Sequence, residues 1–172
     1  MAELTIAAER MAGTACGGMD QTISIMAKMN TAKLIDFVPA LKATDVTIPE
    51  SVVLVIANSL TPSPKLLTLG TRYNKRVVEC RFAVALMALK LKKCNSYMEC
   101  PYTTFEQLQV ALGKTLEEML KESSYILKQG GYTIDMLKRE TGHANPFELV
   151  EKIPHINEVE SKNTVFYLFE RA

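Results

Sequence analysis

Gly13-Thr-Ala-Cys-Gly-Gly-Met-Asp20-Gln21 joins a glycine turn to the start of a predicted helix and is the most informative stretch of this chain. Two adjacent glycines can adopt positive φ and let a ligand approach the backbone closely. Asp20 is the predicted N-cap, where a carboxylate accepts amide hydrogen bonds at the positive end of the helix dipole. Such an acid can take a proton from an alcohol, as the base of a kinase does, but an ordinary capped turn has the same spacing.

The sequence around this turn alternates between helical and strand-like segments. Apolar periodicity predicts helices over residues 3–11 and 20–28. Alternating side chains predict short strands over 31–37 and 44–48. The continuous apolar run 52–57 is typical of a buried strand.

The second half of the sequence is predicted to be all helical. A long amphipathic helix is expected over 74–92, and further helices over 147–152 and 164–171. Three threonines precede short apolar-periodic segments and are predicted helix N-caps: Thr104, Thr115 and Thr133. The fold class is therefore α+β, with short strands and helices in the first half only.

The amino-acid composition argues against nucleic acid, membranes and metal ions as binding partners. The 172 residues include 20 basic and 19 acidic side chains, so the formal charge of +1 predicts no attraction to nucleic acid or to an anionic membrane. No apolar run approaches the roughly 20 residues that span a bilayer. The four cysteines have no zinc-type spacing, so we expect free thiols, no metal site and a cytoplasmic protein. The sequence carries no signal for an oligomeric state.

Three blocks of the sequence resemble the galactokinase branch of the GHMP sugar kinases. They are residues 13–24, residues 32–37 together with 55–59, and residues 73–81. A weaker similarity continues to residue 172. The family's N-terminal sugar signature, its phosphate-binding loop and its closing glycine motif do not occur in the sequence. The resemblance therefore implies an internal fragment with a partial two-layer GHMP-kinase fold. It assigns residues 1–93 to the kinase core and residues 94–172 to a helical region of the middle or C-terminal lobe.

The resemblance also implies roles for three residues. Asp20 aligns with the family's catalytic aspartate, which takes the proton of the sugar's anomeric hydroxyl. Gly17 aligns with a position where the backbone meets the sugar. Tyr73 aligns with an aromatic residue that closes over the sugar. The aligned residue in N-acetylgalactosamine kinases is phenylalanine, so Tyr73 favours galactose as the substrate. ATP and Mg²⁺ are the implied cofactors, and no residue of this sequence is assigned to bind them.

Each assignment has an ordinary structural alternative. Asp20 can be a simple helix cap, Gly17 a turn residue and Tyr73 a half-buried side chain heading a helix. The basic run Arg72, Lys75, Arg76 and Arg81 is interpreted as a solvated face with Glu79 interspersed.

Three hypotheses follow for the chain as a whole. The first is a fragment of a galactokinase-like sugar 1-kinase, or of an N-acetylgalactosamine kinase, that converts ATP and the sugar to the sugar 1-phosphate and ADP. The second is a non-catalytic sugar sensor that binds a partner through apolar surface. The third is a truncated product without stability of its own, because a divided sheet exposes strand edges. In each case the chain alone is expected to lack activity, since the ATP-binding motifs do not occur in it.

Overall fold

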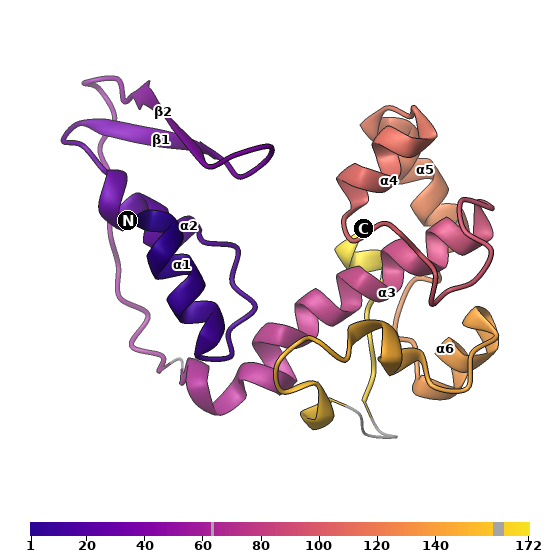
Figure 1. Ribbon diagram of the computed structural model, residues 1–172. Helices are drawn as coiled ribbons and strands as arrows, with labels where there is room; N and C mark the ends of the chain where they lie inside the picture. The colour runs from indigo at the N-terminus through magenta and orange to yellow at the C-terminus, as the bar shows by residue number, and fades with distance from the viewer. Residues whose placement is uncertain (63, 160–163) are drawn as a thin grey trace. The chain divides into compact units, whose positions relative to one another are not determined.

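The computed structural model describes residues 1–62, 64–159 and 164–172, and the chain divides into two compact units (Figure 1). One unit is Met1–Lys65 and the other is Leu66–Ala172. Each unit is described by itself, because their positions relative to one another are not determined. Short strands in the first unit and a mostly helical second unit confirm the predicted α+β class.

The first unit contains two helices and a hairpin. Helix α1 (Ala2–Met11) packs against α2 (Met19–Met26), and strand β1 (Thr31–Asp36) pairs with β2 (Lys42–Thr47). The strands are antiparallel, with Thr31 opposite Thr47 and Asp36 opposite Lys42. The four elements predicted from periodicity are therefore present, with shifted ends.

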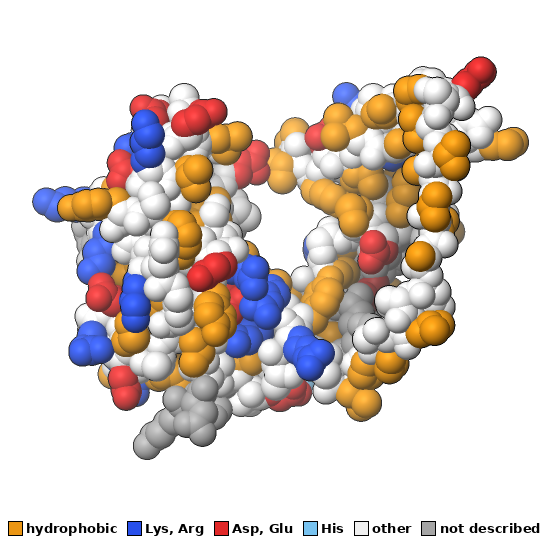
Figure 2. All heavy atoms as spheres, turned by 180° about the vertical axis from the view of Figure 1, so that it is seen from behind, with side chains coloured by type: hydrophobic (Ala, Val, Ile, Leu, Met, Phe, Trp, Pro, Cys, Tyr) orange, Lys and Arg blue, Asp and Glu red, His pale blue; other side chains and the backbone are white. Residues whose placement is uncertain are grey.

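The prediction of a buried strand over residues 52–57 is wrong. This segment has no regular secondary structure, and its side chains are exposed, Val55 by 88% and Ile56 by 96%. Figure 2 shows hydrophobic side chains spread along the right-hand edge of the view, where this segment runs. An apolar run with no polar face needs a paired strand and a covering layer on each side. Within the described part of the first unit, the only sheet is the two-stranded hairpin, and the segment does not join it.

Helix α3 (Lys75–Lys90) forms the centre of the second unit. Around it lie α4 (Phe105–Leu112), α5 (Leu116–Ile126) and α6 (Ile134–Thr141), together with the 3₁₀ turns η3 (Pro146–Val150) and η5 (Phe169–Arg171) (Figure 1). Before α3 come the 3₁₀ turn η1 (Lys65–Thr68) and the π-helical turn η2 (Leu69–Asn74). A further 3₁₀ turn, η4 (Ile156–Glu158), contacts η2.

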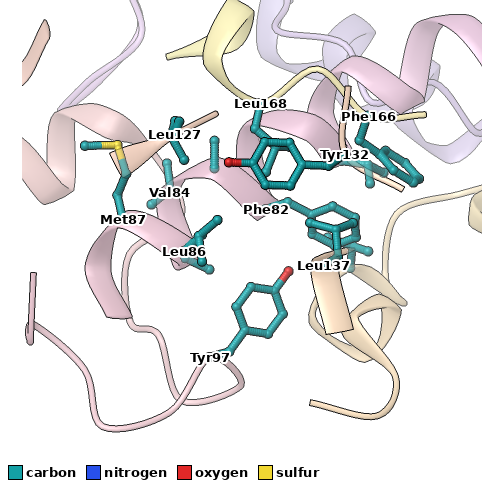
Figure 3. Close-up of a cluster of buried hydrophobic side chains, with 14 of the residues drawn as sticks. Phe82, Val84, Leu86, Met87, Tyr97, Leu127, Tyr132, Leu137, Phe166 and Leu168 are labelled. Atoms are coloured by element: carbon teal, nitrogen blue, oxygen red, sulfur yellow. The ribbon is translucent and has the colours of Figure 1, made fainter. Parts of the chain in front are cut away.

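Aromatic rings fill the core beside α3. The ring centroid of Phe82 lies 5.4 Å from that of Phe166 and 5.6 Å from that of Phe147, both in edge-to-face geometry. Tyr97 reaches into the same cluster from the loop after α3 (Figure 3). Phe82, Tyr97 and Phe166 are fully buried, so this core belongs to the second unit alone.

The short helices begin at the threonines that the sequence predicts. The hydroxyls of Thr104, Thr115 and Thr133 each accept a hydrogen bond from the amide three residues later. The Glu118 carboxylate also accepts the Thr115 amide at 2.8 Å, which completes a capping box. These predicted N-caps are confirmed.

Two helices predicted near the end of the sequence are not α-helices. The segment predicted over 147–152 is the 3₁₀ turn η3. The segment predicted over 164–171 is extended at Phe166, whose amide donates to the Tyr132 carbonyl at 2.9 Å and whose carbonyl accepts the Tyr132 amide at 2.7 Å. Phe166 and Leu168 are buried while Tyr167 between them is exposed, which is the alternation of a strand. Within the described residues, no helix combines the length and the apolar composition needed to cross a membrane.

Candidate functional site

The turn between α1 and α2 and the start of α2 hold two of the three predicted site residues, Gly17 and Asp20. Gly13 and Gly18 adopt positive φ angles of 97° and 102° in this turn. The Arg10 side chain donates from Nε to the Cys16 carbonyl at 3.1 Å, and the Thr22 hydroxyl donates to the Gly18 carbonyl at 2.8 Å. These side chain to backbone bonds fix the turn from both helices.

Gly18, and not Asp20, is the N-cap of α2. The prediction that Asp20 caps this helix is therefore wrong, and α2 begins with no side-chain cap. A side chain at residue 18 would overlap Ile6, whose Cγ1 would lie 2.7 Å from the added Cβ. Close packing of α1 on the turn and the positive φ both require glycine at this position.

Asp20 lies in the first turn of α2 with its side chain exposed. The Asp20 carboxylate has no hydrogen bond or ion pair to any residue that the structure describes, whereas its backbone carbonyl accepts the Ser24 hydroxyl at 2.7 Å. An acid in the first turn lies near the positive end of the helix dipole. The carboxylate is therefore available to a ligand.

Gly17 is exposed, and nothing lies within 4 Å of the place where a Cβ would be. It lines a hollow of about 350 Å³ together with Glu3, Arg10 and Phe37. Asp20 is not among the residues that line this hollow. Sequence reasoning missed Glu3 and Arg10, although their i, i+7 spacing on a predicted helix places them on one face.

Tyr73 lies in η2, in the second unit, and is half-buried. The adjacent Asn74 anchors this turn by donating from Nδ2 to the Pro154 carbonyl at 2.8 Å. The structure thus places Gly17 just before α2 and Asp20 in its first turn, and the place of Tyr73 relative to them is not determined.

The interpretation of the basic run as a solvated face agrees with the exposure of Arg72 and Arg76 and is wrong for Lys75 and the interspersed Glu79. Glu79 is fully buried, and its carboxylate accepts hydrogen bonds from Arg76 at 2.8 Å, Arg171 at 3.0 Å and the Tyr167 amide at 3.1 Å. Lys75 Nζ lies 3.9 Å from the same carboxylate. This charge cluster is a structural feature of the second unit. The i+3 spacing from Arg76 to Glu79 was visible in the sequence, but the partnership with Arg171 was not.

A metal site formed by three or more His, Cys, Asp or Glu side chains does not occur among the described residues. The four cysteines are free thiols, with Cys16 buried and Cys80, Cys94 and Cys100 half-buried. Burial raises the pKa of the Cys80 thiol.

The known proteins that the chain resembles in sequence are galactokinases. The chain is 35% identical to a galactokinase of Dictyostelium discoideum over 170 residues, which cover 91% of this chain and 34% of that protein. It is 31% identical to a galactokinase of Candida parapsilosis over 192 aligned positions, covering 100% of this chain and 37% of that protein. A galactokinase of Saccharomyces cerevisiae is 39% identical over 89 residues, 49% of this chain and 17% of that protein. No family model matches the chain. The chain therefore spans about a third of the length of the first two relatives.

Proposed function

We propose that this chain, which is homologous to the galactokinases over nearly its whole length, is the segment of a sugar 1-kinase that carries the catalytic base. In this proposal Asp20 accepts the proton of the anomeric hydroxyl of galactose. ATP, bound with Mg²⁺ by other parts of the enzyme, supplies the phosphoryl group that the sugar oxygen attacks. The chain supplies the base and part of the sugar site, and the activity belongs to the whole enzyme.

The exposed Asp20 carboxylate is the single observation that carries this proposal. A carboxylate that serves only as a cap would be bonded to amides at the start of α2, and that place is taken by Gly18. Asp20 has no such bond among the described residues, so its carboxylate can approach a hydroxyl within hydrogen-bonding distance.

Gly17 is proposed to present its backbone to the sugar. Its exposure and the open space around it allow a ring hydroxyl to reach the main chain. Arg10 and Glu3 line the hollow beside Gly17 and offer a donor and an acceptor to a polar ligand. Their side chains extend the proposed sugar site beyond the residues implied by the sequence.

Tyr73 is proposed to cover the sugar and to favour galactose over N-acetylgalactosamine. A half-buried tyrosine can pack its ring on a pyranose and donate from its hydroxyl. An N-acetylgalactosamine kinase segment is the alternative within the same family. The division of the parent enzyme at residues 93 and 94, and its cytoplasmic location, remain predictions.

A non-catalytic sugar-binding protein is the second candidate function. The exposed apolar side chains of residues 52–57 favour it, because apolar surface of this kind can bind a partner. Binding without catalysis would leave Asp20 dispensable for chemistry, so substitution of Asp20 separates the two candidates.

The test replaces the matching third of the Dictyostelium discoideum galactokinase with this chain and measures galactose 1-phosphate formation with Mg-ATP. We expect the chimera to be active and Asp20→Asn to lower kcat by about 10²–10⁴-fold with little change in galactose binding. Asp36→Asn is the matched control, because Asp36 is also an exposed acid of the first unit. A folded chimera that binds galactose without phosphorylating it would favour the non-catalytic candidate, and an active Asp20→Asn chimera would remove Asp20 as the base.

A further inference from the structure

Tyr73 lies in a turn of rare geometry. The turn η2 is π-helical over six residues and leads directly into α3. Single π-helical turns are uncommon and frequently occur at functional sites. Relaxation of η2 into the α-helix that follows would rotate the residues ahead of α3 by up to about 100° about the helix axis. The direction of the Tyr73 ring therefore depends on the contacts that hold η2 in its π-helical form.

Asn74 makes one of these contacts. Its side chain is buried at 1% exposure, and its Nδ2 donates to the Pro154 carbonyl at 2.8 Å. This bond joins residues that lie 80 positions apart in the sequence, so it ties η2 to the chain just before η4. Tyr73 and Asn74 are consecutive residues. Anchoring of the Asn74 side chain therefore fixes the backbone from which the half-buried Tyr73 side chain projects.

Gly70 makes a second contact near the other end of η2. Gly70 is buried, and a Cβ added to it would lie 2.7 Å from the His155 carbonyl oxygen and would overlap the Glu158 side chain. The turn that it meets is itself held by two bonds. The Glu158 amide donates to the His155 carbonyl at 3.2 Å, and Glu158 Oε1 lies 3.1 Å from His155 Nδ1. Both ends of η2 are thus packed on residues 154–158.

We propose that Asn74 is a positioning residue of the sugar site, which holds Tyr73 in the orientation that covers galactose. This inference rests on the proposed function, in which Tyr73 packs its ring on the sugar. A ring that is already held loses less conformational freedom when the sugar binds, and this raises affinity. Asn74 acts on sugar binding and not on the chemical step, because the base, Asp20, belongs to the other unit.

A purely structural role for Asn74 leads to a different expectation. A buried hydrogen bond that only stabilises the second unit would, on its loss, reduce the fraction of folded protein. The folded fraction would still bind the sugar with the same affinity. The kinetic coupling between Asn74 and Tyr73 therefore separates positioning from stabilisation.

The test is a double-mutant cycle in the chimera with the Dictyostelium discoideum enzyme. We expect Tyr73→Ala to raise KM for galactose by about tenfold and Asn74→Ala to raise it by about three- to tenfold, each with kcat within about twofold of the parent. The double variant should have the KM of Tyr73→Ala alone, because Asn74 acts through the ring that is then missing. Asn95→Ala is the control, since Asn95 is an exposed amide of the same unit.

A second measurement needs no sugar and uses the 172-residue chain. The sequence contains no tryptophan, so Tyr73→Trp introduces a single fluorescent reporter at this position. In that background we expect Asn74→Ala to increase quenching by acrylamide at least about twofold, with an unchanged circular dichroism spectrum. Gly70→Ala, which displaces the other end of η2, should act in the same direction, and Asn95→Ala should have no effect.

The outcomes separate this inference from the proposed function. Effects on KM that multiply in the double variant, or an Asn74→Ala variant with unchanged KM and unchanged quenching, would overturn the positioning role alone. An unchanged KM in Tyr73→Ala would overturn the role of Tyr73 in the proposed function and this inference with it. An inactive parent chimera would count against the proposed function, and the quenching measurement would then decide whether Asn74 holds residue 73.

Discussion

Glu79 Oε2 accepts a hydrogen bond from Arg171 Nε at 3.0 Å, and this bond ties the middle of the second unit to the turn η5. Glu79 is fully buried, whereas the Arg171 side chain is 32% exposed. A buried carboxylate depends on its partners more than a half-exposed guanidinium does, because only the carboxylate has lost its contact with water. Loss of the Glu79 carboxylate should therefore destabilise the fold more than loss of the Arg171 guanidinium.

Glu79→Gln is predicted to lower the free energy of unfolding by about 2–3 kcal/mol, because the amide keeps the volume but loses two charge-assisted bonds in a buried place. Arg171→Gln should cost only about 1 kcal/mol, since Arg76 and Lys75 still neutralise Glu79. Urea denaturation measures the free energy of unfolding of both variants. Glu151→Gln is the control on an exposed acid, and the prediction fails if Glu79→Gln is no less stable than this variant.

Gly18→Ala is predicted to destabilise the first unit by about 1–3 kcal/mol, while Gly17→Ala stays within about 0.5 kcal/mol of the parent chain. An alanine at residue 18 would have a φ near 102° and would overlap Ile6. An alanine at residue 17 would meet open space. Thermal unfolding followed by circular dichroism compares the two, and equal stability of the variants would contradict the described turn.

Local signals in the sequence predicted much of the fold. The helix starts at Thr115 and Thr133 follow from a hydroxyl that bonds an amide three residues away, so they need no distant partner. The hairpin strands are also local, since β1 and β2 are joined by a short connection. The glycine turn before α2 was correctly placed, but the N-cap of α2 was not. The packing of Ile6 on Gly18 involves a residue of another helix and cannot be predicted from the sequence of the turn alone.

The errors arose where distant segments decide the structure. Phe166 forms a β-bridge with Tyr132, which lies 34 residues earlier in the sequence (166 − 132). This backbone pairing overrides the helical pattern of residues 164–171. Burial of Glu79 depends on Arg171, which is 92 residues away. The sequence could place Gly17 and Asp20 in one turn, but the exposure of Asp20 and the hollow beside Gly17 depend on how α1 and α2 pack.

Acid is predicted to weaken the hairpin through Asp45. Hydrogen bonds from Lys33 and then from Lys28 lower the pKa of the Asp45 carboxyl below its ordinary value of 3.8. A lowered pKa in the folded state means that the stabilisation is present above pH 3.8 and is lost as the pH falls through the folded pKa. Asp45→Asn should remove this part of the pH dependence.

The measurement for Asp45 is the difference in unfolding midpoint between the parent chain and Asp45→Asn, taken from pH 6 down to pH 2. The difference should be small, since the Asp45 side chain is 45% exposed to water, and it should shrink toward zero at the acid end. Asp36→Asn serves as the control. A difference that grows as the pH falls would contradict the sign of the shift.

The exposed run 52–57 leads to the prediction that charge can be placed there without loss of stability. Val55 and Ile56 are almost fully exposed, so Val55→Asp combined with Ile56→Asp should change the free energy of unfolding by no more than about 0.5 kcal/mol per site. The same variant should bind less of a hydrophobic dye and aggregate less, because an apolar segment of high β-propensity promotes association. Val84→Asp is the contrasting control, since Val84 is fully buried on α3 and its replacement should unfold the second unit.

This variant also tests what the run does in a longer enzyme. The relatives of this chain are about three times its length, and a strand that is apolar on both faces is suited to a sheet covered on both sides. In the chimera with the Dictyostelium discoideum enzyme, we therefore expect the double aspartate variant to lose stability and activity, although it is tolerated in the 172-residue chain. Tolerance in both would show that the run stays on the surface, and intolerance in both would show that it is already packed in the chain alone.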